Sequence, residues 1–134
     1  MTSPLSQTGF LSGRIGLASL FLLGAVNKVA DYAATAARME AVGLAPTSLL
    51  LPLVIALELI GGGMVAVGVR YAHVAASILA AYTLATNAFF HRFWMLEDPV
   101  RALELSLFFK NVSIAGGLLL AAAVFASRPT ANAQ

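Results

Sequence analysis

Four long apolar stretches dominate the chain, and short polar segments separate them. They cover about residues 9–30, 47–69, 71–90 and 103–125. Each stretch has about the 20 residues that an α-helix needs to cross a bilayer. The pattern predicts an all-α integral membrane protein, with one transmembrane domain over residues 1–134. We expect an up-down-up-down four-helix bundle, which leaves no room for a soluble catalytic domain.

The polar segments between the spans predict how the helices connect. Residues 31–46 are rich in alanine and indicate a short interfacial helix in the first connection. Almost nothing separates the second span from the third, so these two spans must form an antiparallel hairpin. Within the second span, the consecutive residues Gly61, Gly62 and Gly63 predict close helix packing, because small residues let membrane helices approach one another.

Charge divides the two ends of the predicted bundle. The end that holds both termini and the turn at 70–73, here called the termini end, carries Arg14, Arg70 and Arg128 and no acid. The opposite end, here called the acidic-loop end, carries four basic residues and five of the six acids: Lys28, Arg38, Arg92, Arg101, Asp31, Glu40, Glu97, Asp98 and Glu104. Lys and Arg nearly balance between the ends, and acids contribute little to the positive-inside rule. We expect a bacterial inner-membrane protein with cytoplasmic termini.

Aromatic side chains mark the acidic-loop end as well. Tyr32 lies in the first connection, and Phe93 and Trp94 follow the third span. Because such rings favour the depth of the lipid headgroups, we expect these three residues at the membrane interface.

Composition excludes several classes of protein. Of the 134 residues, 60% are hydrophobic and 10% are charged, whereas a typical soluble domain has about 25% charged residues. A soluble monomer and a disordered chain are both excluded. The eight basic residues are scattered singly, which argues against nucleic-acid binding. The chain has no cysteine, and His91 has no second histidine nearby, so we predict no metal site.

Polar side chains inside the apolar spans are the candidate site. Charged groups at this depth cost at least about 2.5–3.5 kcal/mol each on insertion scales, so each requires a partner or a function. Depth along the spans makes Lys110 the first choice as ion-pair partner of Glu58, and Arg14 the second. Helical spacing predicts one polar cluster in the acidic-loop half of the bundle. The candidate residues are Glu58, Lys110, Asn111, Asn87, His91 and Arg14.

Three interpretations of this cluster stay open. A buried Glu–Lys pair can simply fix which helices pack together. The cluster can also line a pocket for a ligand or redox partner, or form a proton or ion path. Taken alone, Arg14 is typical of a residue that extends its head to the membrane surface, and His91 is typical of an interfacial belt.

Four segments in order resemble the DoxX family of small four-helix bacterial membrane proteins: RIGLASLFLLGAVNKVAD, ALELIGGGMVAVGVR, FFHRFW and FFKNVSIAGGLLLAAA. The resemblance covers about residues 10–125. It implies a link to redox membranes, because the family is named from the small subunits of an archaeal thiosulfate:quinone oxidoreductase. Most members have no assigned activity, and no family position is an established catalytic residue. The positions carried over are Arg14, Gly24, Lys28, Glu58, Gly61, Gly62, Arg70, His91, Lys110 and Asn111.

Three functions compete. The first is a non-catalytic accessory or anchor subunit of a membrane redox system, with a pocket for a quinone or an isoprenoid lipid. In that pocket Lys110, Asn111 and His91 would donate hydrogen bonds to carbonyl oxygens; no covalently bound cofactor is expected. The second is a purely structural subunit that docks on a larger membrane complex or on its own copies. The third is a small proton-coupled exporter, which requires that no base locks Glu58.

Overall fold

The computed structural model describes residues 3–127, and its regular secondary structure there is entirely helical. The four long helices are α1 (Pro4–Ala30), α3 (Thr47–Val67), α4 (Ala72–Phe90) and α5 (Val100–Ser127). Each is long and apolar enough to cross a membrane. The described residues contain no strand. The predicted four-helix membrane bundle is confirmed.

Two short helices lie in the connections, both at the acidic-loop end. The ten-residue helix α2 (Tyr32–Ala41) follows α1, as the alanine-rich segment predicted. The 3₁₀ turn η1 (Phe93–Met95) joins α4 to α5 and was not expected. Its Trp94 packs edge-on against Phe93 and Phe108 and is 56% exposed, so it lies at the end of the bundle and not at its centre.

Caps in the sequence set where the helices begin and end. α1 begins at Pro4 because the Ser3 side chain accepts a hydrogen bond from the Ser6 amide at 3.2 Å, and proline fits the first helical position. α3 ends at Gly68, whose φ of 74° is the left-handed conformation that glycine adopts readily. Arg128, one of the three basic residues assigned to the termini end, lies outside the described residues.

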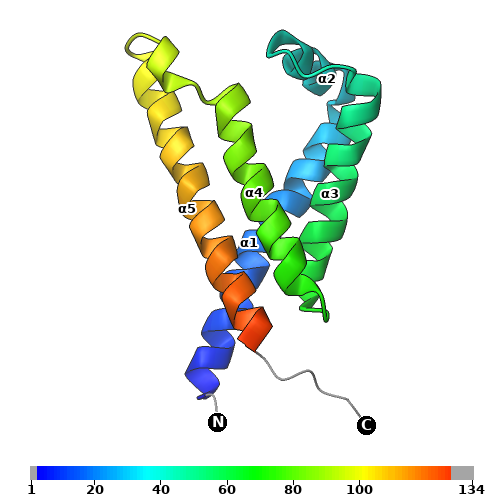
Figure 1. The fold of residues 1–134 in the computed structure, drawn as a ribbon, viewed down its shortest axis with the longest axis vertical. Coiled ribbons are helices and arrows are strands. Elements are labelled where there is room, and N and C mark those ends of the chain that lie inside the picture. Colours follow the sequence, from blue (N-terminus) through cyan, green and yellow to red (C-terminus); the bar gives the residue numbers. More distant parts are fainter. Residues whose placement is uncertain (1–2, 128–134) are drawn as a thin grey trace.

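The long helices form a ring in which each one contacts its neighbours in the sequence. α1 packs along α3, α3 along α4 and α4 along α5, and α5 closes the ring on α1. Figure 1 shows that both termini lie at the same end, where α1 and α5 cross. Toward the other end the α4–α5 pair diverges from the α1–α3 pair, and α2 lies over the ends of α1 and α3.

Small residues bring the helices together in the core. The main core cluster includes Ala18, Ala76 and Leu79, all fully or almost fully buried. A Cβ atom at Gly61 would lie 3.2 Å from the Leu79 side chain, and one at Gly62 would lie 3.3 Å from Phe21 Cβ. The glycine run therefore lets α3 approach both α4 and α1.

Large apolar side chains also cover the outside of the bundle. Leu23 is 62% exposed, Ile60 64% and Leu120 72%, each on a different long helix. An exposed apolar surface on every spanning helix fits a bilayer environment, in which lipid tails cover these side chains.

The close contact at Gly61 predicts a large difference between two neighbouring positions. Gly61→Leu should destabilise the protein by about 1–3 kcal/mol, because the new side chain overpacks against the fully buried Leu79. Gly63→Leu is the matched control, since open space surrounds that position. Thermal unfolding in detergent measures both. Equal melting temperatures for the two variants would contradict the packing described here.

Candidate functional site

A buried carboxylate lies where three helices meet. Glu58, in the middle of α3, is only 4% exposed. The Lys28 ammonium group of α1 donates hydrogen bonds to both of its oxygens, at 2.8 Å to Oε2 and 2.9 Å to Oε1. The Tyr82 hydroxyl of α4 donates to Oε1 at 2.7 Å. Three donors and a full positive charge are the surroundings that an ionised carboxylate needs in a low-dielectric interior. Lys28, Glu58 and Tyr82 are called the Glu58 network below.

A missing side chain makes room for this network. Gly24 lies one helical turn before Lys28 on α1, and a Cβ there would lie 3.3 Å from Glu58 Oε2. The carboxylate therefore packs against the bare backbone of α1. The Lys28 ammonium also lies 3.4 Å from the Gly24 carbonyl oxygen, which accepts a third hydrogen bond from it.

The predicted partners of Glu58 are wrong. Lys110 is exposed on α5, and no Cα atom of α5 lies within 8 Å of a Cα atom of α3 in the described residues. Arg14 lies at the far end of α3, beside Gly68. Depth along the spans does not show which helices are neighbours or how they are offset, and α3 packs along α1 and α4. In the structure Glu58 lies opposite Gly24 and Lys28, so α3 extends beyond the end of α1.

Two other predicted residues meet at the interface between α4 and α5. Asn111 Nδ2 donates to Asn87 Oδ1 at 2.9 Å, and Asn87 Nδ2 donates to the Phe108 carbonyl oxygen at 3.1 Å. Asn87 is 2% exposed, so these bonds satisfy an amide that has little access to water. The pair fixes the register of α4 against α5.

His91 takes part in a separate contact between the same two helices. Its Nδ1 lies 2.7 Å from Glu104 Oε2, and each side chain is about one fifth exposed, at 22% and 20%. Glu104 was expected among the charges of the acidic-loop end, near the start of the span predicted from residue 103. Helix α5, however, begins at Val100, so Glu104 lies in its second turn, within reach of the end of α4. The one polar cluster that was predicted is thus divided among separate places.

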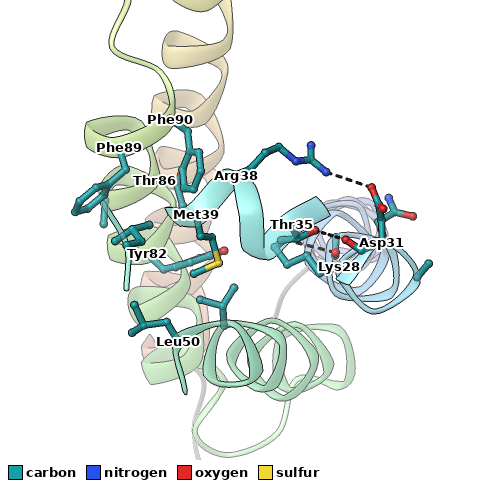
Figure 2. Close-up of a pocket in the computed structure, with 16 residues that line it drawn as sticks. Lys28, Asp31, Thr35, Arg38, Met39, Leu50, Tyr82, Thr86, Phe89 and Phe90 are labelled. Atoms are coloured by element: carbon teal, nitrogen blue, oxygen red, sulfur yellow. Dashed lines mark hydrogen bonds and ion pairs between the residues drawn. The ribbon is translucent and has the colours of Figure 1, made fainter. Parts of the chain in front are cut away.

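A cavity of about 730 Å³ lies between α1, α2, α3 and α4, at the acidic-loop end (Figure 2). Apolar side chains form much of its wall: Met39, Leu44, Leu50, Val54, Phe89 and Phe90. Polar side chains also line it: Asn27, Lys28, Asp31, Thr35, Arg38, Tyr82 and Thr86. Figure 2 shows Met39 of α2 between Tyr82 and Leu50, so α2 supplies one side of the cavity.

The Glu58 network forms part of the cavity wall. The Lys28 side chain is 25% exposed, whereas that of Glu58 is only 5% exposed. Lys28 and Tyr82 thus separate the buried carboxylate from the cavity that they both line. Farther out, Arg38 Nη2 lies 3.3 Å from Asp31 Oδ2, and both of these side chains are exposed. The cavity therefore combines apolar walls with two cationic donors.

Sequence reasoning missed Lys28 and Tyr82 as members of the site. Lys28 carried a signal, since it was one of the positions shared with the resembling family, but it was placed among the flanking charges. Tyr82 had only the weak signal of a hydroxyl in the middle of an apolar span. Among the described residues, no group of three or more His, Asp or Glu side chains is arranged to hold a metal ion.

Breaking the ion pair from one side should destabilise the protein strongly. Lys28→Met should cost about 3–5 kcal/mol, because it leaves a buried carboxylate without its counter-ion. The double variant Lys28→Met with Glu58→Gln should lose much less than the sum of the two single variants. A thermal-stability cycle in detergent measures this coupling.

Lys110→Met is the matched control for that cycle, since Lys110 is an exposed lysine within another span. We expect it to change stability by no more than about 0.5 kcal/mol, as is usual for surface positions. Additive losses for Lys28 and Glu58, or a coupling between Lys110 and Glu58, would refute the assigned pairing.

Comparison with known proteins places the chain in a family. The DoxX family model matches residues 9–92. The inner membrane protein YqjF of Escherichia coli (strain K12) is 36% identical over 118 residues, which cover 88% of this chain and 85% of that protein. No solved structure matches significantly. This relative and the four spanning helices agree with a multi-pass inner-membrane location. The chain belongs to the DoxX family.

Proposed function

We propose that this protein is a non-catalytic subunit of a membrane redox system, with cytoplasmic termini, that holds a quinone or similar isoprenoid lipid in the cavity beside the Glu58 network. The observation that carries the proposal is the cavity itself. Its volume of about 730 Å³ falls within the range of roughly 300–1,000 Å³ that is usual for small-molecule sites.

The lining supports an amphipathic ligand. Leu50, Val54 and Phe89 offer an apolar surface to a tail, and Phe90 offers a ring to an aromatic or quinonoid head group. Arg38 lines the cavity and has five N–H donors and no acceptor, which suits the carbonyl oxygens of a quinone. Lys28 adds positive charge to the wall, while its three N–H donors bind Glu58 and the Gly24 carbonyl. The donors that the sequence had suggested for this role, Lys110, Asn111 and His91, do not line the cavity.

The residues supply a site but no redox centre of their own. The chain has no cysteine, and its two histidines lie at opposite ends of α4. The proposed role is therefore to hold and orient the ligand, while a partner protein exchanges electrons with it.

The Glu58 network argues against the proton-coupled exporter. That function needs Glu58 to take up and release a proton in each cycle. Lys28 and Tyr82 instead occupy both carboxylate oxygens with donated hydrogen bonds. The alternative is a purely structural subunit. It predicts that filling the cavity has no effect on quinone binding.

Filling the cavity should abolish quinone binding. Ala85 lines the cavity on α4, and Ala85→Trp would fill part of it. A short-chain ubiquinone should raise the melting temperature of the wild-type protein in detergent, because a ligand that binds only the native state stabilises it. The same quinone should not change the melting temperature of Ala85→Trp.

Ala88→Trp is the matched control, since Ala88 is exposed on the same helix and does not line the cavity. Ala88→Trp should show the same rise in melting temperature with the quinone as the wild type. An alkane of the same length as the quinone tail controls for nonspecific partition into detergent. The proposal fails if the alkane stabilises as strongly as the quinone, or if both tryptophan variants respond alike. Native mass spectrometry of the protein extracted from its own membrane then tests for a partner subunit.

A further inference from the structure

The termini end of the bundle carries positive charge with no acid to balance it. Of the six acidic residues of the chain, Glu58 lies in the middle of α3 and the other five lie at the acidic-loop end. Arg14 and Arg70 lie at the termini end, and neither forms a salt bridge within residues 3–127. This feature is separate from the cavity and does not depend on the function proposed for it.

Arg14 is held in place by three helices. Its guanidinium lies over the Phe10 ring of α1, 5.9 Å from the centroid. A Cβ atom at Gly68, the residue that ends α3, would collide with Nη1 of Arg14 and lie 3.4 Å from the Phe125 ring of α5. Glycine is favoured at position 68 by its left-handed backbone, and a side chain there would displace the Arg14 guanidinium.

The polar atoms of this guanidinium are not all satisfied. Arg14 Nε is buried and has no hydrogen-bond partner in the described part of the chain. The C-terminal carbonyls of α3 favour a cation nearby through the helix dipole, but a dipole does not replace a counter-ion. A partly buried cation without an anionic partner is costly, so an anion beside the guanidinium would stabilise it.

The length of α3 sets the depth of Arg14 in the membrane. At about 1.5 Å per residue, its 21 residues span roughly 31 Å. That length matches a hydrocarbon core of about 30 Å. Gly68 therefore lies at the boundary between the core and the headgroups, with the Arg14 guanidinium beside it and Arg70 two residues farther along. The lipid phosphates lie just outside this boundary, on the side of the headgroups.

We propose that Arg14 and Arg70 form a binding site for the phosphate of an anionic phospholipid at the termini end. The planar guanidinium of Arg14 suits the paired oxygens of a phosphate, and Phe10 and Phe125 provide an apolar floor beside the lipid's glycerol and first acyl carbons. Arg70, which is exposed and lies over the Tyr71 ring at 5.4 Å, supplies the second charge.

Native mass spectrometry with defined lipids tests the site. The purified protein is offered equal amounts of phosphatidylglycerol and phosphatidylcholine with the same acyl chains. The wild type should retain the anionic lipid about tenfold better, as one charge-assisted contact predicts. Arg14→Gln should remove most of this preference, and Arg14→Lys should keep part of it because it keeps the charge.

Arg92→Gln is the matched control, because it removes one exposed positive charge at the acidic-loop end. It should keep the full lipid preference. Inorganic phosphate at millimolar concentration should not displace the lipid, since it lacks the glycerol and acyl contacts. Equal retention of the two lipids by the wild type would overturn the proposal. So would equal loss in Arg14→Gln and Arg92→Gln, or displacement of the lipid by inorganic phosphate.

Discussion

The arrangement of the helices depends on one requirement, which is that a carboxylate in the middle of a membrane span must be neutralised. Glu58 meets it with the Lys28 ammonium group of α1 and the Tyr82 hydroxyl of α4. Because both donors come from other helices, the ion pair also sets the axial position of α1 and α4 against α3. The small residues Gly24, Gly61 and Gly62 then allow the close approach that these short bonds need.

Polar groups in this protein join helices in pairs and are not gathered in one place. The Glu58 network links α3 to α1 and α4. The Asn87–Asn111 pair and the contact of His91 with Glu104 link α4 to α5. At the acidic-loop end the α4–α5 pair diverges from the α1–α3 pair (Figure 1). The cavity lies there, with α4 on one side, α1 and α3 on the other, and α2 beside it.

Hydropathy predicted the four spans and the tight α3–α4 turn, and the alanine content of residues 31–46 predicted the short helix in the first connection. Those features depend on which residues each segment itself contains, and the sequence gives these directly. The partner of Glu58 depends instead on the axial offset between α1 and α3 and on the rotation of each helix. Sequence positions alone measure neither quantity, so Lys110 and Arg14 were predicted as partners and Lys28 was placed among the flanking charges. The contact of His91 with Glu104 was missed for a related reason, since it depends on where α5 begins.

The identity of the lysine has a consequence for synthesis of the chain. Lys28 precedes Glu58 by 30 residues, so the counter-ion has already been translated when the carboxylate leaves the ribosome. A partner at position 110 would still be absent at that moment. Helices α1 and α3 can therefore enter the bilayer together with the Glu58 carboxylate already paired, and the acidic span does not have to wait in lipid for a later helix to arrive.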